Sequence, residues 1–318
     1  MKELKMKIIG KAGTEEIAIV YIAEIKRGRL IEFVEALQPP LKREEKWVLM
    51  VSTLYGCPVE CLMCDAGGNY KGKLNKQEIF MQIDYMIKRH FPDGRVPVKK
   101  FKIQFARMGE PAFNDEVLKV LEEFPEKYNA PGFIPSISTI GPRFRDRFFE
   151  KLIEIKDEKY PNGKFQLQFS IHTTDEKLRD KIIPAPKWNF KEISEYGERF
   201  YKKGDRKITL NFALAKEYPF EPEILIKHFS PEKFFLKITP LNPTYSAVRN
   251  RLSSYIEIEN IDKKYEIVEK LKSLGYEVII SIGEVEENRI GSNCGQYVLR
   301  AMNKVKIKGS YEYNIIKI

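Results

Sequence analysis

The chain has 318 residues, 43% of them hydrophobic, and carries 55 Lys and Arg residues against 45 Asp and Glu, a formal net charge of +10. No apolar run reaches 18 residues and the N-terminus lacks a signal-peptide pattern, which excludes a membrane span and predicts a cytoplasmic protein. The basic balance favours an anionic partner such as RNA, and nothing in the sequence demands an oligomer, so we expect a monomer.

The first 47 residues are predicted to form a small β-rich extension. Residues 16–23 are an apolar run rich in β-branched side chains, and residues 30–36 alternate apolar with polar side chains, with Gly28 in the turn between them. Pro39 and Pro40 end this pattern, and a charged linker occupies residues 42–46.

From residue 48 onward, predicted strands and helices alternate. The predicted strands cover 48–53, 98–105, 134–140, 165–171, 208–213, 234–238 and 276–282. The predicted helices cover 76–89, 115–124, 144–155, 190–202, 222–228 and 261–274. Such alternation is typical of a parallel sheet with helices outside it, and six or seven strands fall short of an eight-fold barrel. We therefore predict an α/β fold with a partial, TIM-like (β/α)6 barrel over 48–300 and a C-terminal tail over 301–318.

Three of the four cysteines lie within eight residues, as Cys57, Cys61 and Cys64, just after the first predicted barrel strand. This spacing alone predicts a metal site. Three thiolates this close fit one side of an iron–sulfur cube, whose fourth iron stays open for a small molecule. A structural zinc site usually takes four ligands in paired spacings, and the sequence holds no second CxxC. Disulfides cannot satisfy three thiols evenly.

Small and hydroxylated residues follow several of the predicted strands. In parallel β/α folds, the chemistry gathers where the strands end. Side chains of this kind let a backbone approach a ligand closely and offer hydrogen bonds to it. The segments concerned are 107–111, 136–141, 170–174, 239–243 and 291–296.

In this order the segments resemble one family, the radical-SAM adenine methylases of RNA (RlmN/Cfr), from about residue 49 to residue 296. The CxxxCxxC is the signature of the radical-SAM superfamily. Before and after the cysteines, Val51-Ser-Thr-Leu-Tyr-Gly-Cys57 resembles the family's VSSQVGC, and Met108-Gly-Glu-Pro111 with Asn114 resembles its GMGEPLxN. Ser138-Thr139-x-Gly141 resembles STSG, and Ser170-Ile-His172 followed by Arg179 to Pro184 resembles SLHA…RxxLxP. Near the end of the match, Leu241-Asn242-Pro243 resembles FNP and Cys294-Gly-Gln296 resembles CGQ. The resemblance implies a radical-SAM type of barrel and an RNA methyltransferase.

The resemblance also implies a cofactor site. Cys57, Cys61 and Cys64 would hold a [4Fe–4S] cluster that binds S-adenosylmethionine. Glu110 would pair with the ammonium group of its methionine part. The other implied cofactor residues are Gly109, Ser138, Ser170, His172 and Asn242. The alternatives are a structural ion pair for Glu110 and ordinary strand-end capping for Ser138 and Ser170.

Cys294 is the catalytic residue that the resemblance implies. In the family this cysteine takes a methyl group from one S-adenosylmethionine, and a second is cleaved reductively to a 5′-deoxyadenosyl radical. That radical abstracts hydrogen from the methyl group, and the carbon radical adds to an electron-poor adenine carbon of rRNA or tRNA. The electron comes from an external donor such as flavodoxin or ferredoxin. The alternative for a lone cysteine is a small buried hydrophobic residue.

Met50 departs from the family pattern. The family places a second catalytic cysteine, which helps to release the protein–RNA adduct, at this position. A thioether cannot form the mixed disulfide that release needs, and the other four positions use every cysteine of the chain. Three accounts stay open: release by an external thiol, an adduct that breaks down by another route, or different chemistry on the methylated cysteine.

Two further residues are assigned to the substrate side. Arg107 abuts the Gly-Glu-Pro segment, and Glu32 lies in Ile31-Glu32-Phe-Val, which resembles the family's IESV and would make it a pocket base. The alternatives are a solvated loop for Arg107 and a solvated strand carboxylate for Glu32. The alternative function is a radical-SAM enzyme that acts on a metabolite, lipid or peptide with the same cofactor site.

Overall fold

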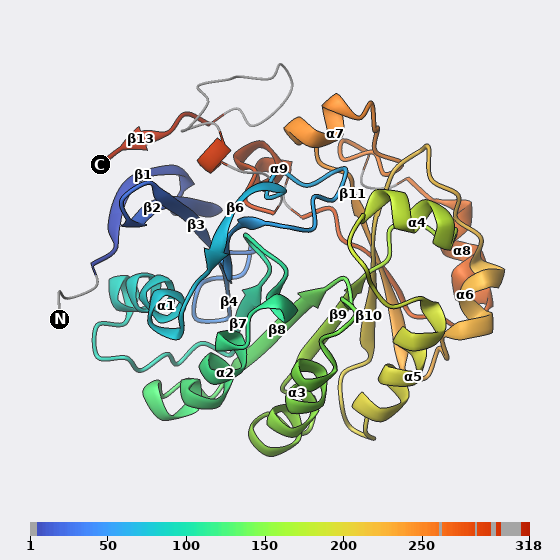
Figure 1. Cartoon of the computed structure of the whole chain (residues 1–318), viewed down its shortest axis with the longest axis horizontal. Coiled ribbons are helices and arrows are strands. Elements are labelled where there is room, and N and C mark those ends of the chain that lie inside the picture. The colour runs from blue at the N-terminus through green and yellow to red at the C-terminus, as the bar shows by residue number, and fades with distance from the viewer. Residues whose placement is uncertain (1–4, 261–262, 284, 294–296, 300–312) are drawn as a thin grey trace.

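The structure is a computed structural model that describes residues 5–260, 263–283, 285–293, 297–299 and 313–318. Its strands form one sheet of 11 strands in the order β12-β11-β10-β9-β8-β7-β4-β3-β2-β1-β13, with a separate hairpin of β5 and β6 (Figure 1). The predicted α/β fold is confirmed.

Seven neighbouring strands of the described sheet run parallel to one another. They are β4 (Lys46–Val51), β7 (Lys100–Phe105), β8 (Phe133–Thr139), β9 (Gln166–Ser170), β10 (Ile208–Leu214), β11 (Phe234–Pro240) and β12 (Val278–Ile280). The sheet is curved but is not closed into a barrel within the described residues, since β12 at one edge pairs only with β11.

Six helices lie along the outer side of the sheet (Figure 1): α1 (Lys76–His90), α2 (Glu116–Lys127), α3 (Asp146–Lys159), α5 (Phe190–Phe200), α6 (Pro222–His228) and α8 (Glu266–Ser273). The shorter helices α4 (Glu176–Ile182) and α7 (Tyr245–Arg249) and the 3₁₀ helix η1 (Pro111–Phe113) lie in connections between strands, and α9 (Val285–Ile290) follows β12. No helix among the described residues has the length and apolar run that crossing a membrane requires.

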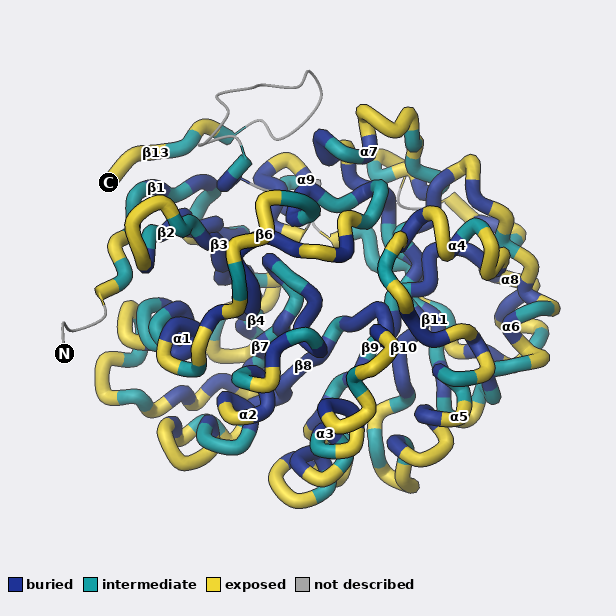
Figure 2. Tube along the Cα trace, in the orientation of Figure 1, coloured by how far each residue is buried: buried dark blue, intermediate teal, exposed yellow. Residues whose placement is uncertain are grey.

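The core lies between the sheet and these helices. In β11, Phe234, Leu236 and Ile238 are fully buried, whereas the alternate residues are only half-buried. This period of two is what a strand shows when one face packs against helices. Figure 2 shows the same contrast, with buried tube through the sheet and exposed tube on the outer turns of the helices.

The first strands extend the same sheet in antiparallel fashion. β1 (Lys7–Thr14), β2 (Ala18–Lys26) and β3 (Arg29–Ala36) form a meander, and β3 pairs with β4. β13 (Ile316–Lys317), close to the C-terminus, pairs with β1. The predicted β-rich character of residues 1–47 therefore matches the described strands, which share one sheet with the parallel strands.

Several short elements escaped the sequence prediction. They are β1, the hairpin of β5 (Leu54–Cys57) and β6 (Gly68–Lys73), and the helices α4, α7 and α9. None of them carries a long periodic pattern, because each has eight residues or fewer. The helix predicted over 261–274 begins instead at Glu266, and residues 261–262 lie outside the described part of the chain.

Candidate functional site

The three clustered cysteines lie at and just after the end of β5. Cys57 is the last residue of that strand, and Cys61 and Cys64 follow in the loop that leads to β6. Burial raises the pKa of the Cys57 thiol to about 12, and the nearby thiol of Cys64 adds to the effect. Burial likewise raises the pKa of Cys61 and of Cys64. These thiols lose their protons only when a metal compensates the buried negative charge.

Within the described residues, Glu15, Glu35 and His90 bring three potential ligand atoms within 4.8 Å of one another, and the three cysteine sulfurs do not form such a group. The assignment of an iron–sulfur cluster to the three thiols remains a prediction from the CxxxCxxC motif.

The outer side of the cysteine loop is held by two helices. The backbone N–H of Leu62 donates to the carbonyl of Ile182 at the end of α4 (2.9 Å). Asp65 accepts hydrogen bonds from the N–H groups of Tyr245 (3.0 Å) and Ser246 (2.8 Å) in the first turn of α7. The hydroxyl of Thr244 donates to the carbonyl of Met63 (2.7 Å). The loop is therefore fixed in place by residues distant in sequence.

Glu110 is a buried carboxylate with three hydrogen-bond donors. It accepts from the hydroxyl of Thr139 (2.5 Å) and from the backbone N–H groups of Ala112 (3.0 Å) and Ile140 (2.9 Å). Burial raises the pKa of Glu110 to about 7, against the opposing effect of these bonds. No described Lys, Arg or His forms an ion pair with it, so the site can accept a ligand's ammonium group.

The segment that carries Glu110 is tied directly to the cysteine strand. The backbone N–H groups of Thr53 and Leu54 both donate to the carbonyl of Met108 (2.8 and 3.1 Å). Gly109 has φ +98°, and a Cβ atom there would lie 2.4 Å from Cγ of Leu54. Packing of β5 thus requires glycine at this position, and the close approach of a cofactor remains a prediction. The three cysteines and Glu110 form one connected wall.

Asn114, at the end of the same motif, has a structural role. Its Nδ2 donates to the carbonyls of Thr53 (2.8 Å) and Leu74 (2.7 Å), which flank the β5–β6 hairpin. Its Oδ1 accepts from the N–H of Glu116 at the start of α2 (3.2 Å). The asparagine therefore fixes the cysteine hairpin to the Glu110 segment.

The remaining predicted cofactor residues lie at the ends of β8 to β11. The hydroxyl of Ser138 accepts a hydrogen bond from the side chain of Gln168. His172 has φ +68°, and its Nδ1 accepts from the N–H of Ala213 (3.1 Å). Burial lowers the pKa of His172 to about 3, so the imidazole is neutral at physiological pH. Asn242 is buried, and its Oδ1 has no hydrogen-bond partner in the described structure.

Two residues of the site were not singled out from the sequence. Thr139, and not its neighbour Ser138, donates to Glu110. Arg179 is 2% exposed and donates to the carbonyls of Ile140 (3.0 Å) and Ser170 (3.1 Å), which joins the ends of β8 and β9. The sequence signals were the adjacent hydroxyl residues of the Ser-Thr motif and the arginine that begins the Arg…Pro184 match.

Arg107 and Glu32 form a buried ion pair of 2.7 Å. Their side chains are 2% and 0% exposed, so the alternatives of a solvated loop and a solvated strand carboxylate are wrong. Arg107 donates to the carbonyls of Ser292 (2.7 Å) and Gly291 (3.1 Å), and Glu32 accepts from the N–H of Val298 (3.0 Å). Burial raises the pKa of Glu32, and the Arg107 charge opposes this.

The pair thus holds the chain on both sides of residues 294–296, which include the predicted catalytic Cys294 and lie outside the described residues.

Met50 is buried on β4, where it stands beside Gln104 of β7 and Val34 of β3. The substrate-side roles of Met50, Arg107 and Glu32 remain predictions.

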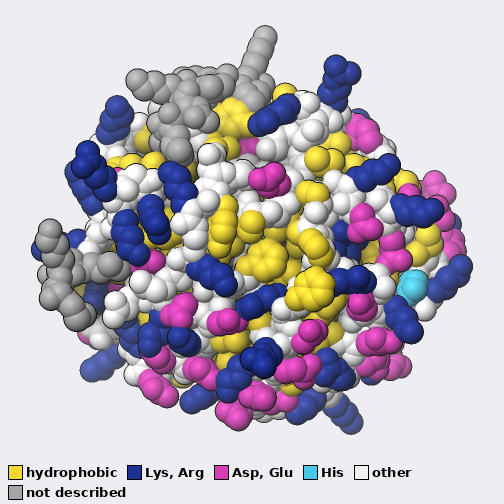
Figure 3. Space-filling view, in the orientation of Figure 1, with side chains coloured by type: hydrophobic (Ala, Val, Ile, Leu, Met, Phe, Trp, Pro, Cys, Tyr) yellow, Lys and Arg dark blue, Asp and Glu magenta, His cyan; other side chains and the backbone are white. Residues whose placement is uncertain are grey.

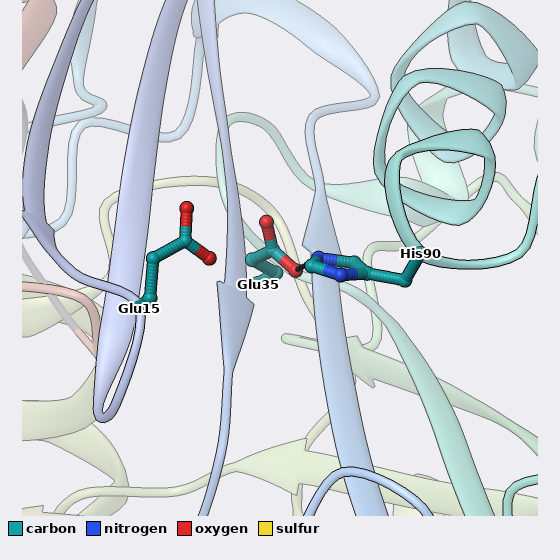
Figure 4. Close-up of side chains that lie close together, drawn as sticks. All are labelled: Glu15, Glu35 and His90. Atoms are coloured by element: carbon teal, nitrogen blue, oxygen red, sulfur yellow. Dashed lines mark hydrogen bonds and ion pairs between the residues drawn. The ribbon is translucent and has the colours of Figure 1, made fainter.

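A second group of potential metal ligands lies beside the meander (Figure 4). Glu35 carries most of its contacts: it accepts hydrogen bonds from Tyr21 (2.5 Å), Arg43 (3.0 Å) and Arg89 (2.6 Å), and it contacts His90 (2.8 Å). Two arginines already neutralise this carboxylate. The group is therefore an ion-pair network that joins α1 to the meander.

No family model matches the chain. The chain is similar to curated proteins named probable dual-specificity RNA methyltransferase RlmN. It is 29% identical to the protein of Pseudothermotoga lettingae over 234 residues, covering 71% of this chain and 62% of the relative. It is 25% identical to that of Streptomyces griseus over 283 residues, covering 85% and 70%. The chain thus spans less than two thirds of the Pseudothermotoga relative.

One solved structure shares the fold over nearly the whole chain. It is the crystal structure of a radical SAM methyltransferase from Sphaerobacter thermophilus, with a TM-score of 0.71 and 20% identity, covering 92% of this chain and 80% of that chain. The predicted resemblance is confirmed: the chain is similar to proteins named RNA methyltransferase RlmN, and it shares the fold of a radical SAM methyltransferase.

Proposed function

We propose that this protein is a radical-SAM RNA methyltransferase that methylates an sp² carbon of adenine, in rRNA or tRNA, through a methyl group carried on Cys294. The observation that carries the proposal is the wall formed by three thiols, one buried and two half-buried, and by Glu110, a buried carboxylate that pairs with no cation among the described residues. The similarity to relatives named RNA methyltransferase supports the choice of RNA as substrate.

The residues of the site fit the two groups that this function requires. Cys57, Cys61 and Cys64 would hold a [4Fe–4S] cluster, and Glu110 would bind the ammonium of S-adenosylmethionine. When bound, these groups supply the one-electron cleavage that generates a 5′-deoxyadenosyl radical, with the electron from an external donor such as flavodoxin or ferredoxin. Asn242, whose buried Oδ1 has no hydrogen-bond partner among the described residues, would offer an acceptor to a ribose hydroxyl or to the adenine edge.

The chain's own residues hold and enclose these groups. Thr139 and the N–H of Ile140 orient the Glu110 carboxylate toward its ligand. Arg179 keeps the ends of β8 and β9 together. Buried apolar side chains that include Val59, Met63, Ile140, Ile182 and Leu241 pack around the cysteine loop and keep water from it.

Cys294 would act as a thiolate that takes the methyl group of one S-adenosylmethionine: a new C–S bond would form on Cys294 as the methyl–sulfonium bond breaks, and S-adenosylhomocysteine would leave. Met50 offers no thiol for the later release of an adduct, so release depends on an external thiol or on a different breakdown route. The proposal therefore has two steps. Loading of the methyl group needs the thiol of Cys294 but no second cysteine, whereas release of the adduct is tested by adding a small thiol to the reaction.

The loading step is tested by mass spectrometry. The cluster is reconstituted anaerobically, deuteriomethyl S-adenosylmethionine is added, and the mass of the Cys294 peptide is measured. We expect a labelled methyl group on Cys294 in the wild type and none in Cys294→Ala, with 5′-deoxyadenosine still formed in both. An unmodified Cys294 with continued 5′-deoxyadenosine formation would support the alternative of a metabolite, lipid or peptide substrate.

The RNA is tested separately. Immobilised tRNA and rRNA fragments are offered at low salt, and we expect retention that weakens as salt rises because phosphate contacts release counterions. The labelled methyl group should then appear in the RNA. Met50→Cys, which restores a thiol at the position of the family's second cysteine, should increase turnover when no external thiol is added. Absence of RNA binding at every salt concentration would rule out the proposed substrate.

A further inference from the structure

Phe144 is the most exposed large hydrophobic side chain among the described residues, at 85%. It lies in the loop between β8 and α3, five residues after Thr139. Its backbone has φ +64°, in the left-handed region that bulky residues rarely adopt. A strained backbone and an exposed aromatic ring both disfavour folding unless the ring serves a purpose outside the fold.

The loop backbone is pinned on both sides of Phe144. Before it, the N–H of Arg143 donates to the carbonyl of Pro186 (3.1 Å), and the N–H of Trp188 donates to the carbonyl of Gly141 (2.7 Å). After it, Nε of Arg145 donates to the carbonyl of Ala112 (2.6 Å). The ring is therefore presented to solvent by a backbone that cannot easily relax, so binding to it costs little conformational entropy.

The loop is attached to the proposed cofactor wall. The N–H of Ile140, near the start of the loop, donates to Glu110. Ala112, whose carbonyl accepts from Arg145, also donates its N–H to Glu110. Figure 3 shows hydrophobic side chains gathered on this face of the molecule, between β6 and α4. The loop that carries Phe144 is therefore hydrogen-bonded to the segment that holds Glu110.

Three arginines surround the ring in sequence, as Arg143, Arg145 and Arg147. Arg147 is exposed and forms no hydrogen bond or ion pair among the described residues. Arg143 pairs with Glu192 (3.1 Å) but is 46% exposed, and Arg145 pairs with Asp115. An exposed ring beside the partly exposed Arg143 and the exposed Arg147 suits a base and its neighbouring phosphates, although Asp146 between the arginines is also exposed.

We propose that Phe144 is a stacking platform for an unpaired base of the RNA, and that Arg143 and Arg147 attract the adjacent phosphates. The identity of the polymer rests on the proposed function, whereas the stacking role rests on the exposure, the backbone conformation and the charges of this loop.

The test measures binding of a fluorescein-labelled single-stranded RNA 12-mer of mixed sequence, and of its perfect duplex, to the cluster-loaded protein by fluorescence anisotropy. We expect Phe144→Ala to bind the single strand about tenfold more weakly, as when a base loses an aromatic partner. Phe144→Trp should bind as the wild type does, and duplex binding should not change. Ile226→Ala, on α6 at 37% exposure, is the matched control.

A second variant separates binding from folding. Glycine adopts a positive φ without strain, so Phe144→Gly should melt at the same or a higher temperature than the wild type while losing the same RNA affinity. Wild-type affinity for the single strand in both Phe144→Ala and Phe144→Gly would overturn the stacking role, as would an equal loss of duplex binding. If the wild type itself binds neither RNA, both this inference and the proposed function fail.

Discussion

Two buried glutamates, Glu110 and Glu32, lie on neighbouring parts of the site and have opposite surroundings. Glu32 is paired with Arg107, only three residues before Glu110, and accepts from the chain beyond residue 294. Glu110 has three hydrogen-bond donors but no cation in the described structure. One carboxylate is neutralised from within the protein, whereas in the proposed function the other is neutralised by the ammonium group of a ligand.

This comparison teaches how burial alone fails to identify a binding residue. Both side chains are nearly inaccessible, and burial raises the pKa of each. The presence or absence of an internal cation separates a structural clamp from a ligand site. The strongest tests therefore remove a charge on one side and ask whether stability or ligand binding responds.

The largest effect is expected from Arg107→Met. It leaves the Glu32 carboxylate buried without its partner, which costs about 3–5 kcal/mol of unfolding free energy. Chemical denaturation of the cluster-free protein measures this. Glu32→Gln combined with Arg107→Met should recover part of the loss, because no uncompensated charge remains. Equal stability of Arg107→Met and the wild type would show that the pair is not a clamp.

A smaller and different effect is expected from Glu110→Gln. Loss of a charge-assisted bond to the ligand ammonium should weaken S-adenosylmethionine binding by about 1.5–3 kcal/mol, roughly 10- to 150-fold. Isothermal titration of the cluster-loaded protein measures this. Lys119→Gln, which neutralises an exposed charge on α2, is the control and should bind normally. Unchanged affinity in Glu110→Gln would place the ammonium elsewhere.

The same variant changes the pH dependence of stability. Because the folded-state pKa of Glu110 is raised from 4.5 to about 7, the folded state holds its proton longer than the unfolded state does. The stability of the cluster-free wild type should therefore fall as pH rises from 4.5 through about 7. Glu110→Gln should lack this part of the slope in denaturation curves recorded across that window; an identical slope in both proteins would contradict the shift.

The smallest effect is expected from Thr139→Val. It removes one neutral donor from Glu110, worth about 1 kcal/mol, so S-adenosylmethionine binding should weaken about fivefold. Ser138→Ala is the informative partner, because the family resemblance makes Ser138 a cofactor-binding residue whereas the structure places its hydroxyl against Gln168. Weaker binding in Ser138→Ala alone would favour the resemblance over the described contacts.

The sequence predicted the parallel strands well because each is a short run of apolar residues or of alternating apolar and polar residues, such as β7 and β9. β10 and β11 begin at the predicted residues 208 and 234, and α6 has the predicted bounds. The β5–β6 hairpin escaped prediction because Gly68–Lys73 is polar and mostly exposed, and it is held by pairing with β5. Pairing with a neighbouring strand cannot be predicted from the local pattern of apolar and polar residues.

The site was predictable where chemistry depends on residue type and spacing, as with the three cysteines. It was less predictable where a contact depends on which neighbour points inward. Thr139 and Ser138 are adjacent hydroxyl residues on one strand and face opposite sides of the sheet, so only the structure shows which one reaches Glu110. The Arg107–Glu32 pair joins residues 75 positions apart and leaves no trace in local pattern.

The pairing of β3 with β4 has a practical consequence for dissecting the protein. A fragment that starts near residue 48 would leave β4, a central and largely buried strand, with an open edge of unpaired backbone groups. It would also lack Glu32, the counter-charge of Arg107. Expression of such a fragment should yield aggregates, so the meander has to be kept in any minimal catalytic unit.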